Sequence, residues 1–294
     1  MDIVRAIVLG IAQGLTEFLP ISSSGHLILV PWLFGWDQSG LEFDAALHLG
    51  TLAAVFAYFR RDIVNMLQAI PVALRSPLQT LWYRTETTEN EHSDDRHVYA
   101  KLGLLIVFAS VPGGIAGLLA AGSIDDMFHD PDNIQRAVVI IAIMLALFAL
   151  VLWLAEGRSS RSRRLSVLSL RDALIIGAAQ ALALLPGVSR SGVTLSAGLF
   201  RGLHRADAAR FSFLLGIPLI TLAGLAGVVD IVRTSPDSRD IMVLLAGLIS
   251  AALSGLAAIW GLLRFLQHSS TMVFIVYRLV VATSVILLVV SGIR

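Results

Sequence analysis

Residues 13–26 read Gln-Gly-Leu-Thr-Glu-Phe-Leu-Pro-Ile-Ser-Ser-Ser-Gly-His, and this polar stretch is flanked by the apolar runs 3–11 and 27–34. Ionisable groups inside an apolar segment are costly in lipid and usually mark function. Pro20 removes a backbone donor and restricts the residue before it, so one straight helix is disfavoured. Each apolar arm is short for a hydrocarbon core that needs about 20 residues. We therefore predict a re-entrant helical hairpin that turns near Pro20–Ser24.

A second copy of this pattern occupies residues 180–192, which read Gln-Ala-Leu-Ala-Leu-Leu-Pro-Gly-Val-Ser-Arg-Ser-Gly. Aligning Gln13 with Gln180 also aligns Ser22 with Ser189, and Ser23 then meets Arg190. Paired interrupted apolar segments in two halves of a chain indicate inverted repeats with a site between them. We predict repeats over roughly 1–155 and 171–294, within a single membrane domain spanning 1–294.

Composition places the chain in the membrane. Of its 294 residues, 56% are hydrophobic and 15% charged, with mean hydropathy +0.79, whereas soluble domains carry about 25% charged residues. We predict an all-α polytopic protein with six transmembrane helices plus the two re-entrant hairpins. The expected spans are 43–59, 101–121, 137–155, 211–232, 241–263 and 272–290. Between the first two we expect an amphipathic interfacial helix over 63–74 and a polar loop over 76–97, and an acidic loop after residue 121. The absence of cysteine excludes disulfides and thiolate chemistry, and a net charge of +1 argues against nucleic-acid partners.

The loop charges predict an orientation. Arginines concentrate in 60–101, 156–171, 201–210 and 264–271, which the positive-inside rule places in the cytoplasm. Three spans and one hairpin per half make the halves inverted. The first hairpin then enters from outside and the second from inside, so their tips meet near the midplane.

Both tips read as helix N-termini, which favour anions. The Arg190 guanidinium between them suits bidentate binding of phosphate oxygens. A Ser-Ser-Ser-Gly run is often only a cap, and Arg190 alone would be explained by snorkelling, but their coincidence at two repeat-related breaks favours a site. The expected phosphate-binding residues are Ser22, Ser24, Gly25, Ser189, Ser191 and Gly192.

His26 and Glu17 supply the expected chemistry at the first tip. His26 follows Ser23 by three residues, a helical spacing that suits a nucleophile and its proton partner. A direct His26 nucleophile, and water held by His26 or Glu17, stay open. A carboxylate beside a phosphate-binding site repels the phosphate unless a divalent cation or a proton lies between them. We therefore expect Mg²⁺ or Ca²⁺ bound by Glu17 and Gln13. Asp44 and His48 form another helical pair, equally consistent with a supporting or an interfacial role.

These residues resemble a known family. Residues 13–26, and Pro-Gly-Val-Ser-Arg-Ser-Gly at 186–192, are similar to the two signature regions of the undecaprenyl-pyrophosphate phosphatases, the bacitracin-resistance proteins. Residues 43–51 also look familial, and the resemblance covers essentially the whole chain. The family's acidic motif allows Glu or Gln at its first position; here it is Gln13, which makes direct metal binding less certain than in members with two carboxylates.

The resemblance implies a bacterial inner-membrane enzyme that removes the terminal phosphate of the C55 lipid diphosphate. Its product is the lipid monophosphate that carries peptidoglycan precursors, and its activity confers bacitracin resistance. Glu17, Ser23, His26 and Arg190 are then the expected catalytic residues, in a pocket open to the periplasmic side. The partners are lipid substrate and membrane lipids, and a homodimer is left open.

Two rival classes were weighed. A transporter or lipid flippase shares inverted repeats with broken helices, and phosphate release by purified protein would distinguish it. The other membrane phosphatase superfamily needs a lysine motif and a histidine soon after Ser-Arg. Lys101 is the sole lysine and lacks the Arg-Pro that should follow, and no histidine follows Arg190 before His204, so we reject this class.

Overall fold

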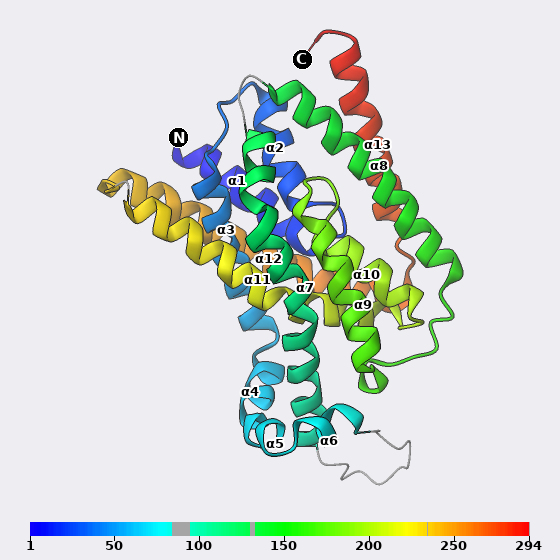
Figure 1. The fold of residues 1–294 in the computed structure, drawn as a ribbon. Helices are drawn as coiled ribbons and strands as arrows, with labels where there is room; N and C mark the ends of the chain where they lie inside the picture. The colour runs from blue at the N-terminus through cyan, green and yellow to red at the C-terminus, as the bar shows by residue number, and fades with distance from the viewer. Residues whose placement is uncertain (84–94, 130–132, 234, 294) are drawn as a thin grey trace.

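A computed structural model describes residues 1–83, 95–129, 133–233 and 235–293, and these residues form helices with no strand. Five helices are long and apolar enough to cross a membrane, which makes the chain a multi-pass membrane protein (Figure 1). They are α7 (Asp95–His129), α8 (Ile134–Arg158), α11 (Arg205–Arg233), α12 (Ser238–His268) and α13 (Met272–Val290).

The sixth expected span is a helix of 18 residues, α3 (Leu41–Tyr58). It is not among the five apolar helices, and it carries Glu42, Asp44 and His48. Five of the six predicted spans are therefore confirmed as long apolar helices, and the sixth is a helix with polar groups in its first half.

Each predicted hairpin consists of two helical arms with a break between them. The first joins α1 (Ile3–Phe18) to α2 (Ser23–Phe34). The second runs from α9 (Leu170–Gln180) through the 3₁₀ turn η3 (Ala181–Leu184) to α10 (Arg190–Phe200). In both, the arm after the break starts on a capping serine, as the sequence predicted.

The two breaks have the same local geometry. Ser22 and Ser189 both have positive φ, 78° and 73°. Each hydroxyl accepts a hydrogen bond from the backbone N–H of the glycine three residues on, at 3.3 Å for Gly25 and 3.1 Å for Gly192. The caps satisfy donors that a helix start leaves free.

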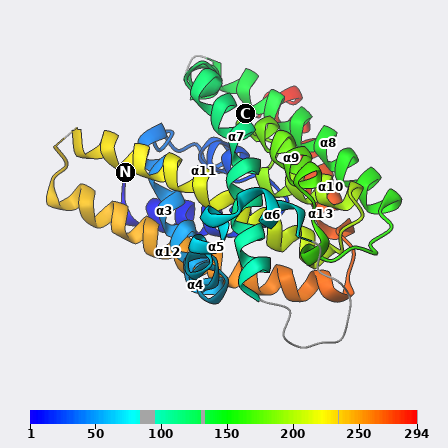
Figure 2. The same ribbon diagram turned by 60° about the horizontal axis from the view of Figure 1, so that its bottom comes forward.

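The helix contacts of the two halves correspond: exchanging each helix for its counterpart in the other half turns one contact into another that is also present. Contacts of α1 with α12 are matched by contacts of α9 with α7, while α3 packs on α11 and α8 on α13 (Figures 1 and 2). The exchanged pairs rely on small residues. A Cβ on Gly14 would lie 2.4 Å from Ala251 O, and one on Gly177 would lie 2.0 Å from Ala109 O. Close backbone approach through small residues is typical of membrane helix pairs. The inverted repeat itself stays a prediction.

A buried carboxylate closes the base of the second hairpin. Asp172 accepts hydrogen bonds from Arg163 at 2.7 Å, from Arg201 at 2.6 Å and from Ser169 at 2.7 Å. Burial alone would raise the pKa of Asp172, but these hydrogen bonds outweigh burial and hold its pKa well below the usual range. Arg163 and Arg201 are therefore structural partners of this carboxylate, and their role as topology signals stays a prediction.

The region between the first two spans differs from its prediction. The expected amphipathic helix over 63–74 is split into α4 (Arg60–Gln68) and α5 (Ile70–Arg75). The loop expected over 76–97 contains α6 (Pro77–Trp82), and α7 already begins at Asp95. Proline at an N-terminal position starts both α5 and α6, where its missing N–H costs nothing. Residues 84–94, 130–132, 234 and 294 lie outside the described chain, and with them residues 84–94 of the loop expected over 76–97. The acidic loop expected after residue 121 is instead helical as far as His129, where α7 ends, and only residues 130–132 of it lie outside the described chain.

The small-residue contact between α1 and α12 predicts a stability effect. We expect Gly14→Ala to lower the unfolding free energy by about 1–3 kcal/mol, because its methyl group would meet the backbone of α12. Gly261→Ala on α12 is the matched control, since nothing lies within 4 Å of its added Cβ. Thermal unfolding in detergent measures both. A Gly14→Ala variant as stable as the control would contradict this packing.

Candidate functional site

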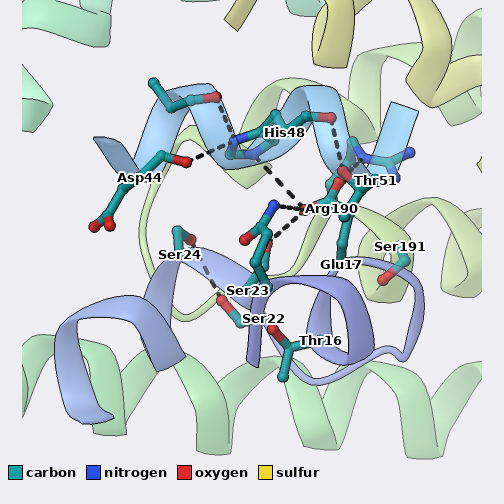
Figure 3. A network of polar contacts seen from close by, with 12 residues as sticks. Thr16, Glu17, Ser22, Ser23, Ser24, Asp44, His48, Thr51, Arg190 and Ser191 are labelled. Atoms are coloured by element: carbon teal, nitrogen blue, oxygen red, sulfur yellow. Dashed lines mark hydrogen bonds and ion pairs between the residues drawn. The ribbon is translucent and has the colours of Figure 1, made fainter. Parts of the chain in front are cut away.

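Glu17 is the centre of a polar cluster buried between the two hairpins. Its side chain is only 4% exposed. Oε2 accepts hydrogen bonds from Ser23 Oγ at 2.7 Å and Gln13 Nε2 at 3.3 Å. Oε1 accepts from Nε and Nη2 of Arg190, at 3.3 and 3.1 Å. One carboxylate thus joins the end of α1, the start of α2 and the start of α10 (Figure 3).

Arg190 reaches Glu17 from the opposite tip. Its Nη1 donates to Ser212 O of α11 at 2.8 Å, so three of the five N–H groups of a guanidinium have partners in the protein. Gly216, one turn further along α11, provides the space: a Cβ there would lie 2.2 Å from Nη1. The guanidinium is therefore held on three sides, and it is 12% exposed.

His48 approaches the same carboxylate from α3. Its Nε2 lies 3.7 Å from Glu17 Oε2. Its Nδ1 faces the carbonyl oxygens of Asp44 and Ala45, at 3.1 and 3.2 Å, and donates to them. The Asp44 carboxylate instead accepts from Ser39 Oγ at 2.5 Å. The predicted Asp44–His48 pair therefore contributes His48 to the cluster and leaves the Asp44 side chain outside it (Figure 3).

The described hydrogen bonds of His26 do not include Ser23, in contrast to the expected pair. Its Nδ1 donates to Ser22 O at 2.6 Å, which leaves Nε2 to accept from the Tyr277 hydroxyl at 2.9 Å. The Tyr277 ring also stacks on the imidazole, with centroids 5.8 Å apart. The described contacts give Ser23 a different proton partner, Glu17. Helical spacing put Ser23 and His26 near each other but did not decide which groups their side chains bond.

Two of the six residues expected to bind phosphate, Ser22 and Ser191, form the junction of the tips. Ser22 Oγ accepts from Gly187 N at 3.0 Å, and Ser191 Oγ donates to Leu19 O at 3.0 Å, so each tip bonds the other. Ser22, Ser189 and Ser191 are buried, as are Gly25 and Gly192, while Ser24 is half-buried. The expected contact between the two tips is thus present.

The cluster places a hydroxyl, a carboxylate and a guanidinium within hydrogen-bond reach. A serine whose proton is held by a carboxylate is an activated nucleophile, and a buried guanidinium stabilises developing negative charge. Oxygen donors for a cation are also present, because the buried Gln13 Oε1 has no hydrogen-bond partner in the described chain. The described part of the chain contains no group of three or more His, Asp or Glu side chains placed to hold a metal ion.

The sequence does not point to Tyr277, and it gives His48 no contact with Glu17. Tyr277 lies on α13, 251 residues from His26, so local spacing offers no signal for it. His48 was noted only as half of a pair with Asp44. The only signal for His48 in the sequence was its helical spacing from Asp44 within an apolar run.

Comparison with known proteins gives one family. The profile described as bacitracin resistance protein BacA matches residues 6–284. A Thermomicrobium roseum protein named undecaprenyl-diphosphatase is 47% identical over 294 residues, covering 100% of both chains. Proteins of the same name from Synechococcus elongatus and Geobacter sulfurreducens are 43% and 42% identical, over 99% and 97% of this chain and 95% and 98% of their own.

Proposed function

The chain belongs to the bacitracin resistance protein BacA family, and we propose that the cluster around Glu17 is its catalytic centre for hydrolysing undecaprenyl diphosphate. The enzyme releases the terminal phosphate and leaves the lipid monophosphate, the carrier used in peptidoglycan synthesis. The observation that carries this assignment is the Ser23–Glu17–Arg190 contact across the two tips. This contact brings the proposed nucleophile, its base and the anion-binding group together in the interior of the protein.

Ser23 is the proposed nucleophile. Its Oγ attacks the terminal phosphorus, the Oγ–P bond forms, and the anhydride P–O bond to the lipid phosphate breaks. The hydroxyl proton passes to Glu17 Oε2, 2.7 Å away, and is available to the departing phosphate. Water then attacks the phosphoserine and releases inorganic phosphate. The alternative is direct attack by a water that Glu17 activates, with Ser23 as a phosphate donor.

Arg190 and the two helix starts are the proposed anion partners. Two guanidinium N–H groups remain beyond the described contacts, enough to bind phosphoryl oxygens. The first turns of α2 and α10 add the partial positive charge of helix N-termini. His26 supports the first tip through Ser22 O, so we assign it a positioning role.

A divalent cation, Mg²⁺ or Ca²⁺, is the proposed cofactor. The Glu17 carboxylate and the unpaired Gln13 Oε1 are hard oxygen donors that suit these ions, with substrate phosphate and water completing the set. When bound, such an ion neutralises charge on the phosphate oxygens. Gln13 and Glu17 are the residues that would hold it.

The proposed location is the bacterial inner membrane, with the site open to the periplasm. Its support is the arginine-rich loops and the family membership. If a cysteine introduced at Ser24 reacted with an impermeant reagent only from the cytoplasmic side, this orientation would be wrong.

Removing the nucleophile or its base should abolish turnover. We expect Ser23→Ala and Glu17→Gln each to lower phosphate release from undecaprenyl diphosphate at least roughly 100-fold, because proton transfer to a positioned base is lost. Acid-stable phosphoserine, recovered from a rapidly quenched reaction of the parent, would identify the covalent route. Acid-labile phosphohistidine would instead favour His26, and neither product would favour water. A Ser23→Ala variant with parental turnover would refute both proposed roles of Ser23.

Arg190 should be needed for its geometry and not only its charge. We expect Arg190→Lys to lower kcat about 100-fold, because a single ammonium cannot bind Glu17 and phosphoryl oxygens as a planar fork does. Gly216→Ala should also lower kcat, since its methyl group occupies the space of Nη1. Arg233→Lys is the matched control, on an arginine whose side chain is 76% exposed. Parental turnover in Arg190→Lys would show that charge alone suffices.

The cation should stabilise the protein as well as support turnover. We expect Mg²⁺ or Ca²⁺ to raise the unfolding temperature of the parent in detergent, and Glu17→Gln to remove that rise. Gln13→Glu should tolerate or strengthen it, because a second carboxylate adds charge. An unfolding temperature unaffected by either ion, with turnover that survives chelators, would show that Glu17 acts without a metal.

A further inference from the structure

Arg278 is a charged residue in the interior of the protein that the mechanism above does not use. It lies on α13, is 0% exposed, and is among the largest fully buried side chains. All its described hydrogen bonds go to backbone carbonyls, and none of the described ion pairs involves it. A buried charge without a counter-ion is costly, so its surroundings need an explanation.

The carbonyls that Arg278 binds belong to three separate segments. Nη1 donates to Pro20 O at 3.1 Å, in the break of the first hairpin. Nη2 donates to Gly187 O at 2.8 Å and Val188 O at 3.2 Å, in the break of the second. Nε donates to Leu145 O of α8 at 3.0 Å. One planar group therefore joins both tips and fixes them to a membrane-spanning helix.

The carbonyls that Arg278 binds at the two tips have no helical partners of their own in the described chain. Pro20, Gly187 and Val188 lie where each hairpin is not helical. Backbone groups buried at such a break must be satisfied by protein, because lipid offers no hydrogen bonds. Several rigid donors in one plane suit this task better than the single ammonium of lysine.

The tips that Arg278 joins carry the reacting groups. Pro20 lies between Glu17 and Ser23 in the chain, and Val188 is two residues before Arg190. A Cβ on Gly192 would lie 3.1 Å from Nη1, so the guanidinium sits beneath the first turn of α10. A carboxylate partner there would cancel positive potential beside a site for a polyanion. Carbonyl acceptors bind Arg278 without adding negative charge.

Resting on the proposed function, we infer that Arg278 is a positioning residue for phosphate release, which holds Ser23 and Glu17 of one tip in register with Arg190 of the other. Misplacement of reacting groups by about 1 Å costs roughly 100-fold in rate. Arg278 acts through the spacing of the tips and does not touch substrate. Its loss should therefore lower kcat more than it raises KM.

The test compares Arg278→Lys and Arg278→Gln with the parent in detergent. Lysine keeps the charge but loses the planar donors, and glutamine removes the buried charge while keeping one amide donor. We expect kcat to fall about 100-fold in both, with KM changed less than about threefold. Ile275→Ala is the matched control, a cavity on the same helix at a residue 3% exposed, and should lower the unfolding temperature while keeping kcat.

The spacing of the tips is measured directly by spin labels. The chain has no cysteine, so Leu15→Cys and Leu182→Cys, at exposed positions on the two hairpins, label them selectively. The distance distribution should broaden or shift in the Arg278 variants and stay parental in Ile275→Ala. If the lysine variant does not fold, the glutamine variant decides, because neutral replacement of a buried ion is often tolerated.

The outcomes separate three explanations. Parental kcat in Arg278→Lys with loss in Arg278→Gln would show that charge alone matters and would overturn the inference. Unchanged label distances with lowered kcat would do the same, and so would a lower unfolding temperature with parental kcat. A parent that releases no phosphate from undecaprenyl diphosphate would refute the proposed function. A fully active parent with fully active variants would refute only the role of Arg278.

Discussion

A helix that stops inside a membrane leaves backbone donors and acceptors that lipid does not satisfy. The two helix breaks beside the Glu17 cluster are buried or half-buried within the protein, so their backbone groups face a similar constraint. The chain breaks two helices, and each break supplies partners for the other: Ser22 receives the Gly187 N–H, and Ser191 donates to Leu19 O. The carbonyls of Pro20, Gly187 and Val188 accept from Arg278. The polar contents of the site are thus held in place by the need to satisfy the same breaks that create it.

A consequence of this arrangement is that the proposed catalytic groups come from elements far apart in the chain. Glu17 and Ser23 are local to each other, whereas Arg190 is 173 residues from Glu17 along the sequence. Close packing through glycine brings the elements together, as Gly14 does between α1 and α12, and Gly216 gives room for the Arg190 side chain. Small residues therefore matter for chemistry here, although they carry none.

The sequence predicted the helical class, the two broken hairpins and the contact of their tips, because these follow from apolar length, proline and repetition. It also predicted Glu17, Ser23 and Arg190 as neighbours. It did not predict that Ser23 bonds Glu17 and His26 bonds Tyr277, since helical spacing only says which side chains share a face. Tertiary packing of α3 and α13 decides which groups meet. Of the short helices between α3 and α7, α6 lies in a segment predicted to be a loop, because polar composition alone does not distinguish a loop from a solvated helix.

The positions of Ser22 and Ser189 each make two conflicting demands on the residue that occupies them. A φ of 78° or 73° suits glycine, which has no Cβ to strain, whereas the cap needs a hydroxyl that glycine lacks. Ser22 and Ser189 satisfy the cap and carry the strain, which is typically of order 1–3 kcal/mol per residue. A substitution at either position that relaxes the backbone, as glycine would, therefore removes the hydroxyl that caps the helix start. Asparagine and aspartate are the alternatives at these positions, because each combines a short side-chain acceptor with tolerance of a positive φ.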